Sequence, residues 1–179
     1  MPKLEVEAKF PVDCAVLDEV KRRLSRLGAV HAGDSLERDY YLLHPCRDFI
    51  ESDEALRIRM TPSGEKVRVT YKGPRIPSRA KSRIEVEAIS DNTIIEVFEM
   101  LGFKTGIVVE KHRSYYKLDG KALILLDDVK GLGCFVEIES INIDDEEILD
   151  IASKLGLDTT TMTTDSYAYM LYKKLKREL

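Results

Sequence analysis

Pairs of like-charged residues two positions apart recur in several β-rich segments of this 179-residue chain. Glu5 and Glu7 alternate with apolar residues, and so do Arg57 and Arg59. Because successive strand side chains point to opposite faces, the members of each pair share a face. Neighbouring carboxylates suit a hard divalent cation such as Mg²⁺ or Mn²⁺, whereas paired guanidinium groups suit the oxygens of a phosphate chain. The spacing therefore predicts a cation site and a phosphate site on strand faces.

Five strands carry an ionic face by this alternation. For one strand alone, the usual interpretation is the solvated polar face of an antiparallel sheet. Like charges on several strands change that interpretation, because each pair is unfavourable without a shared counter-ion. The further residues on these faces are Lys9, Arg68, Thr70, Lys72, Arg83, Glu85, Glu87, Glu137 and Glu139, with a less regular set of Lys111, Arg113, Tyr115 and Asp127.

The elements that must position these residues are mainly strands. Period-2 patterns predict eight of them, and helical spacing predicts four helices with apolar stripes. Short turns between most strands favour an antiparallel sheet, and eight twisted strands can close into a barrel with the ionic face inside. We expect one α+β domain over residues 1–179, with the helices packed outside the barrel. The predicted strands are 3–10, 35–43, 55–61, 65–72, 81–89, 107–118, 122–129 and 134–141, and the helices are 13–27, 91–101, 144–155 and 164–175.

Composition and short sequence patterns argue against several classes of protein. The 28 basic and 32 acidic residues give a formal net charge of −4, which argues against nucleic acid as the main partner. No apolar run reaches the roughly 18 residues of a membrane span, and residues 1–10 lack a signal-peptide pattern. Cys14, Cys46 and Cys134 have no CxxC spacing, so we expect neither a disulfide framework nor a zinc site. These features favour a reducing cytoplasm.

Three further patterns favour ordinary structural roles. His31 and His44 lack an acidic or cysteine partner at ligand spacing, and His112 lies opposite the ionic face of its strand, so we expect none of the three to be catalytic. A stripe of Tyr167, Leu171 and Leu175 indicates a helix packing face. The segment 73–80, GPRIPSRA, is typical of a loop.

Seven short motifs occur along nearly the whole chain. They are Glu5-Val-Glu7-Ala-Lys9, 56–59 (LRIR), 72–74 (KGP), 83–87 (RIEVE), 110–113 (EKHR), 126–139 (LDDVKGLGCFVEIE) and 166–167 (SY). In this order they resemble the CYTH superfamily, the triphosphate tunnel enzymes. The block from Asp127 to Glu139 is most similar to the branch of class IV, CyaB-type adenylyl cyclases.

The resemblance implies an eight-stranded antiparallel tunnel and a role for each matching residue. Glu85 and Glu87 either contact the metal or orient the arginines, and a general base, if a residue supplies one, is Glu137 or Glu139. The implied ligands of Mg²⁺ or Mn²⁺ are Glu5, Glu7, Asp127, Glu137 and Glu139. The implied triphosphate-binding residues are Lys9, Arg57, Arg59, Lys72, Arg83, Lys111 and Arg113.

Three functions remain open from the sequence. The first is a metal-dependent adenylyl cyclase that converts ATP to cyclic AMP and pyrophosphate. The second is a triphosphatase acting on inorganic triphosphate, thiamine triphosphate or a nucleoside triphosphate. The third is a non-catalytic polyphosphate-binding module, which would not require the metal carboxylates. In each case the expected partner is a triphosphate-containing small molecule rather than nucleic acid or a membrane, and the resemblance suggests a homodimer.

Overall fold

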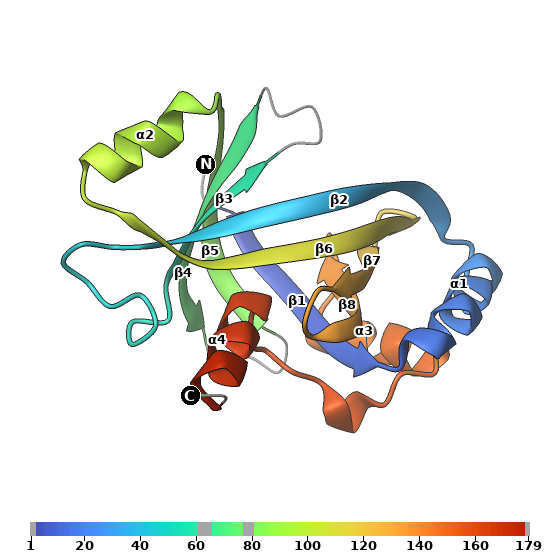
Figure 1. Cartoon of the computed structure of the whole chain (residues 1–179). Helices are drawn as coiled ribbons and strands as arrows, with labels where there is room; N and C mark the ends of the chain where they lie inside the picture. The colour runs from blue at the N-terminus through green and yellow to red at the C-terminus, as the bar shows by residue number, and fades with distance from the viewer. Residues whose placement is uncertain (1–2, 61–65, 77–80, 178–179) are drawn as a thin grey trace.

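Eight antiparallel strands close into a barrel in the computed structural model, which describes residues 3–60, 66–76 and 81–177 (Figure 1). Around the ring the strands follow the order β1, β5, β4, β3, β2, β6, β7, β8. The strands are β1 (Lys3–Val12), β2 (Val30–Leu43), β3 (Ala55–Met60), β4 (Val67–Ile76), β5 (Lys81–Ser90), β6 (Lys104–Leu118), β7 (Ala122–Val129) and β8 (Gly133–Ser140). The predicted α+β barrel is thus confirmed. The predicted strand positions Lys66 and Ile141 are not in strands, and the predicted positions Thr61 and Glu65 lie outside the described residues.

The longest strands extend beyond their predicted limits. β2 and β6 pair from Val30–Lys117 to Leu43–Lys104, with register shifts at His31/Gly33 and Tyr40/Leu42. A shift at the first point, where Gly33 has a φ of 128°, lets β2 begin at Val30, ahead of its predicted start at Ser35. β4 also continues past its predicted end through a shift between Lys72 and Arg75. The loop prediction is therefore wrong for residues 73–76, and residues 77–80 lie outside the described ranges.

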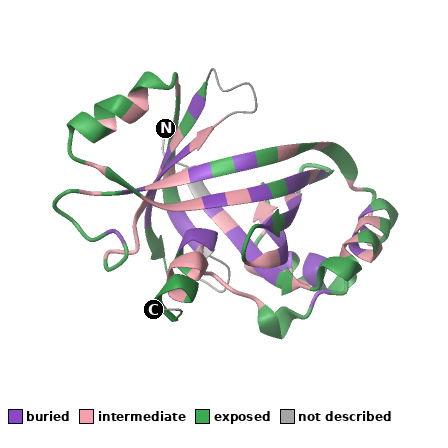
Figure 2. Cartoon of the chain, in the orientation of Figure 1, coloured by how far each residue is buried: buried purple, intermediate pink, exposed green. Residues whose placement is uncertain are grey.

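Three helices cover the outer face of the barrel, where even-numbered side chains of most strands point. α1 (Leu17–Arg26) and α3 (Asp145–Lys154) pack over β1, β7 and β8 in the largest apolar cluster, which contains the fully buried Phe10 and Ile138. α2 (Thr93–Met100) packs through Phe98 against a second cluster around Ile58. Figure 2 shows α2 as largely exposed, and its described residues include none that is buried. The strands therefore form the frame of the domain, and these helices cover its outer face.

The fourth helix, α4 (Tyr167–Arg177), occupies a different position. Its residues Tyr167 and Ala168 pack with Val109, Val129 and Phe135. These three strand residues share the strand face of Lys111, Asp127 and Glu137, which points into the barrel. The start of α4 therefore closes part of one end of the barrel. The predicted packing face holds at its beginning, although Leu175 is 51% exposed.

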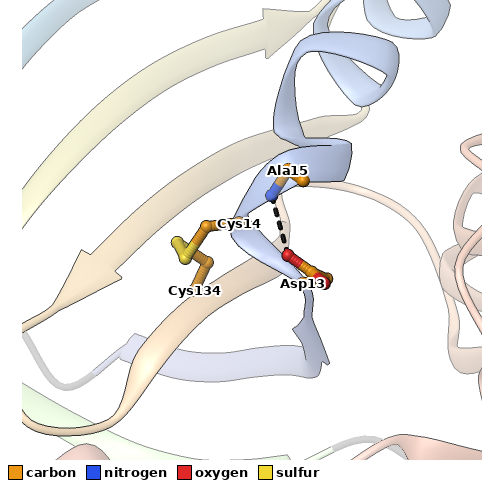
Figure 3. Close-up of a disulfide and its surroundings, with 4 residues drawn as sticks. All are labelled: Asp13, Cys14, Ala15 and Cys134. Atoms are coloured by element: carbon orange, nitrogen blue, oxygen red, sulfur yellow. Dashed lines mark hydrogen bonds between the residues drawn. A yellow bond between two sulfur atoms is a disulfide. The ribbon is translucent and has the colours of Figure 1, made fainter.

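The structure pairs two of the three cysteines. Cys14, in the short 3₁₀ helix η1 (Cys14–Val16), forms a disulfide with Cys134 at the start of β8 (Figure 3). The prediction of no disulfide was wrong because the two residues are 120 positions apart and only the β1–β8 register, with Val12 opposite Cys134, brings them together. Cys46 is free and exposed. The pairing removes the cysteine-based argument for a reducing compartment, so the cytoplasmic location stays a prediction.

Candidate functional site

The barrel encloses a cavity of about 540 Å³ whose lining is mostly charged. The side chains come from all eight described strands and from the start of α4, as the alternation of strand faces requires. Among the predicted site residues, Asp127 is absent from this lining. Those that line the cavity are Glu5, Glu7, Lys9, Arg57, Arg59, Lys72, Arg83, Glu85, Glu87, Lys111, Arg113, Glu137 and Glu139.

Four carboxylates from β1 and β8 form one side of the cavity, here called the acidic wall: Glu5, Glu7, Glu137 and Glu139. Glu7 lies directly opposite Glu139 in the antiparallel register. Burial and the nearby Glu7 carboxylate raise the pKa of both Glu5 and Glu137 above the usual range. Like charges opposite one another in a sheet repel. The oxygen donors of this wall fit a hard divalent cation, which would relieve that repulsion.

Lys9 lies beside the acidic wall. Its Nζ is 3.4 Å from Glu137 Oε2 and 3.6 Å from Glu7 Oε1. Burial lowers the pKa of Lys9, but the Glu137 and Glu7 carboxylates outweigh that effect and raise it. The ammonium also lies 4.6 Å from the centre of the Tyr167 ring. Lys9 is therefore charged and held at the end of the acidic wall.

A second side, here called the basic wall, consists of Arg57, Arg59, Lys111 and Arg113 from β3 and β6. Arg113 lies at its edge and donates from Nη2 to Glu137 of the acidic wall at 3.2 Å. Burial and the adjacent Arg113 and Arg59 lower the pKa of Lys111, so positive charge is concentrated there. The Nε of Arg57 is buried and has no hydrogen-bond partner among the described residues. Arg57 instead donates from Nη2 to Thr70 at 3.0 Å. A buried, unpaired guanidinium N–H beside further cations fits an anionic ligand with several oxygens.

Two buried carboxylates on β2, Glu37 and Asp39, hold the basic wall in place, and the sequence analysis missed both. Asp39 accepts from Arg59 at 2.6 and 2.7 Å and from Lys111 at 3.1 Å. Glu37 contacts Arg59 at 2.9 Å and Lys111 at 2.8 Å. Burial alone would raise the pKa of Glu37, but Lys111 and Arg59 lower it to about 2. The sequence signal that could have identified these two residues is their acid-x-acid spacing, the same pattern as Glu5 and Glu7.

Asp127 lies behind the cavity lining and is fully buried. Its carboxylate accepts from Arg113 at 2.6 Å and from the Tyr167 hydroxyl at 2.7 Å. Burial and the Asp127 carboxylate raise the pKa of Tyr167 well above the usual range. Tyr167 is thus a lining residue that the helical spacing assigned to packing alone. The described contacts place Asp127 as a partner of Arg113, and its role as a metal ligand stays a prediction.

Lys72, Arg83, Glu85 and Glu87 connect the two walls along β4 and β5. Lys72 donates to Glu5 at 2.7 Å and is 3.0 Å from Glu85, while Arg83 is 3.4 Å from Glu5. Glu87 accepts from Arg68 at 2.5 Å. Glu85 and Glu87 therefore both contact basic side chains. That Glu85 or Glu87 contacts the metal stays a prediction.

Comparisons with known proteins agree with this geometry. The CYTH domain family matches residues 3–167. A Methanocaldococcus jannaschii protein named as a putative adenylate cyclase is 36% identical over 173 residues, covering 92% of this chain and 96% of that protein. Adenylate cyclase CyaB of Aeromonas hydrophila is 30% identical, covering 97% and 91%. The solved structure of the PH1819 protein from Pyrococcus horikoshii superimposes with a TM-score of 0.80 at 34% identity, covering 95% and 99%.

The barrel and its charged cavity define a triphosphate-tunnel type of fold, and the chain belongs to the CYTH domain family. Members of this family include adenylyl cyclases and triphosphatases. Within the described residues, no helix is both long and apolar enough to cross a membrane.

Proposed function

We propose that this protein is a metal-dependent enzyme that acts on a triphosphate inside the barrel, and that the reaction is the conversion of ATP to cyclic AMP and pyrophosphate. The observation that carries the proposal is the presence of the two walls in one cavity. Carboxylates crowd one another on the acidic wall, and the basic wall presents an unpaired buried N–H. A metal ion would relieve the repulsion on the first wall, and a polyphosphate chain would accept the hydrogen bond that the second can donate.

Glu5, Glu7, Glu137 and Glu139 would hold the divalent cation, because they are the carboxylates on the acidic wall. Mg²⁺ or Mn²⁺ bound there would neutralise and polarise phosphate oxygens. Asp127 would become a metal ligand only if one of its carboxylate oxygens gave up the hydrogen bond from Arg113 or Tyr167.

The basic wall would bind the phosphate chain. Arg57 has hydrogen-bonding capacity to spare, whereas Arg59 and Lys111 are aimed by Glu37 and Asp39. Lys9, Lys72 and Arg83 extend the positive charge toward the acidic wall. Fixed cations that need no reorientation during phosphoryl transfer stabilise the charge that develops on the oxygens. Positioning and electrostatics then supply the catalysis without a covalent nucleophile.

In the cyclase reaction, the ATP 3′-hydroxyl oxygen attacks the α-phosphorus, the bond from that phosphorus to the bridging oxygen breaks, and pyrophosphate leaves. The hydroxyl proton must pass to a base. Glu137 and Glu139 are the candidates, because both are carboxylates at the cavity surface. The relatives named as adenylate cyclases favour this reaction for the present chain.

Hydrolysis is the second candidate function, because the same walls would hold a triphosphate for attack by water on the terminal phosphorus. The substrate would then be inorganic triphosphate, thiamine triphosphate or a nucleoside triphosphate. A binding module without catalysis is disfavoured by the acidic wall, which phosphate binding alone would not need. We propose a small molecule as the main partner, rather than nucleic acid or a membrane, and we keep a homodimer and a cytoplasmic location as predictions.

Product analysis tests the proposal. Purified protein is incubated with Mg²⁺ or Mn²⁺ and either ATP or inorganic triphosphate, and cyclic AMP, pyrophosphate, ADP and orthophosphate are separated. Cyclic AMP with pyrophosphate is the expected result. Orthophosphate without cyclic AMP would replace the cyclase with the triphosphatase, and tight metal-dependent binding without turnover would leave only the binding module.

A further inference from the structure

We propose that a second cavity, at the α4 end of the barrel, binds the neutral heteroaromatic base of an organic triphosphate. This inference rests on the proposed function and names the substrate class of the same site. The cavity has a volume of about 160 Å³. Its lining includes Phe49, Ile107, Ala168, Tyr169 and Tyr172. Sites for small organic ligands typically combine apolar and aromatic walls with a few polar groups.

The second cavity adjoins the charged cavity. Tyr41, Arg83 and Ser166 line both. When a triphosphate is held between the acidic and basic walls, the organic group attached to it could therefore extend into the second cavity. The change in lining, from charged side chains to apolar and aromatic ones, matches the change in chemistry along an organic triphosphate.

Aromatic rings supply the surface that a heterocycle needs. Tyr169 and Tyr172 lie on α4 with ring centres 6.4 Å apart and an angle of 23° between their planes. Tyr169 is 37% exposed and Tyr172 is half-buried. The ammonium groups of Lys173 and Lys176 lie 4.8 and 4.9 Å from the centres of the Tyr169 and Tyr172 rings, so a base would stack on the ring surface that they leave uncovered. Phe49 is buried on the facing segment. Bases stack on such rings with little dependence on which base is present.

Three separate segments are tied together to frame this cavity. Arg75, near the end of β4, donates from Nε to Asp53 at 2.6 Å and from Nη1 to Thr164 at 3.1 Å. Its backbone N–H also donates to Asp53 at 3.0 Å. Asp53 has a φ of 55°, and it is the one non-glycine residue with positive φ in the described part of the chain. Backbone strain of this kind persists where the surroundings hold it, and such positions cluster at ligand sites.

The charge around the second cavity favours a neutral base over a cationic ring. Each carboxylate of the lining already has a basic partner: Asp53 pairs with Arg75, Asp165 accepts from Lys173 at 2.6 Å, and Glu54 lies 3.5 Å from Arg47. A thiazolium ring, as in thiamine triphosphate, would find no uncompensated anion among these groups. A neutral base needs only stacking and hydrogen bonds, and the side-chain hydroxyls of the lining residues Thr164 and Ser166 can supply the latter.

Calorimetric titration tests this inference with ATP, thiamine triphosphate and tripolyphosphate, in EDTA so that metal-dependent turnover cannot occur. The variants are Tyr169→Leu and Tyr172→Leu, which keep an apolar side chain but remove the ring. Leu175→Ala is the matched control, because Leu175 is an exposed residue of the same helix outside both cavity linings. We expect wild-type protein to bind ATP more tightly than either other ligand. Each tyrosine variant should lose roughly 5- to 100-fold in ATP affinity and keep its tripolyphosphate affinity, and the control should match wild type.

Each other outcome has a distinct meaning. Equal losses for ATP and tripolyphosphate would show that the tyrosines shape the charged cavity, and unchanged ATP affinity in both variants would show that the base lies elsewhere; either result overturns the inference and leaves the proposed function standing. Thiamine triphosphate binding as tightly as ATP would overturn the preference for a neutral base. Wild-type protein that binds none of the three ligands in EDTA, and forms no product from ATP or inorganic triphosphate with Mg²⁺ or Mn²⁺, would instead remove the proposed function, and this inference with it. Protein that binds no ligand in EDTA but still turns over ATP with metal would show that the second cavity adds no metal-independent contact, and would overturn this inference alone.

Discussion

Buried carboxylates lie both on the acidic wall and beside the basic wall, but their pKa values are shifted in opposite directions. Glu5 and Glu137 on the acidic wall and Glu37 and Asp39 beside the basic wall are all buried on inner strand faces. Burial and a neighbouring carboxylate raise the pKa of the first two. For the second two, arginine and lysine outweigh burial and lower the pKa. The direction of the shift therefore separates carboxylates crowded by other carboxylates from carboxylates whose charge is balanced by arginine and lysine.

This difference assigns different tasks to residues that look alike in the sequence. Carboxylates with raised pKa values destabilise the empty cavity, and a bound cation relieves the repulsion between them. Carboxylates with lowered pKa values are part of the scaffold, because each fixes a base that would otherwise repel its neighbours. The predictions below test whether the two groups can be separated by experiment.

The largest effect is expected on the acidic wall. The double variant Glu5→Gln/Glu7→Gln should reduce metal-dependent turnover by about 10³-fold or more, since it removes two negatively charged candidate ligands. Turnover is measured against Mg²⁺ concentration. Glu110→Gln is the matched control, because Glu110 lies on the outer face of β6, where it pairs with Lys130. A double variant with the wild-type metal titration would exclude both residues from the cation site.

The next largest effect is expected for the scaffold carboxylate Asp39. Asp39→Asn removes the charge that Arg59 and Lys111 share, so buried cations lose their partner. Breaking a buried pair in this way typically costs about 3–5 kcal/mol in the free energy of unfolding. Asp150→Asn, which breaks the exposed pair with Lys154, should cost less than about 1 kcal/mol. Urea unfolding of both variants checks the contrast, and similar losses in the two would contradict the scaffold role.

A smaller effect separates two arginines of the basic wall. Arg57→Ala should weaken tripolyphosphate binding by about 10- to 100-fold, the value of a charged hydrogen bond or two, while stability changes little. Arg59→Ala should weaken binding and also lower stability, because Asp39 loses its two hydrogen bonds from Arg59. Arg38→Ala, on the outer face of β2 and 3.2 Å from Glu110, is the control. Calorimetry and urea unfolding together distinguish the two, and unchanged binding in both variants would remove the basic wall from the site.

Local alternation was sufficient to predict the charged face of five strands, although it missed the buried carboxylates of β2. Arg57, Arg59, Glu137 and Glu139 all line the cavity, as their spacing required. The alternation works because a closed barrel forces one face of every strand inward, so each residue's place follows from its parity. The same reasoning predicted the barrel itself from eight short strands.

Contacts between distant segments could not be predicted in this way. The task of Asp39 depends on the pairing of β2 with both β3 and β6, which places it near Arg59 and Lys111. Tyr167 has the spacing of a packing residue, and only the position of α4 at the end of the barrel brings its hydroxyl to Asp127. In each case the deciding fact is which elements become neighbours, and local periodicity carries no such information.

The smallest effect concerns Glu37 and the pH dependence of stability. The pKa of Glu37 falls from its ordinary value of 4.5 to about 2 in the folded protein. A carboxyl group with a lowered pKa stabilises the fold above its unfolded pKa, and that contribution disappears as the pH falls through the folded value. Glu37→Gln should therefore lose about 2 kcal/mol at pH 7, with a difference from wild type that shrinks between about pH 4.5 and pH 2. Urea unfolding at several pH values measures this difference. A difference that stays constant across that range would mean that Glu37 acts through its shape rather than its charge, which would place it outside the group of scaffold carboxylates.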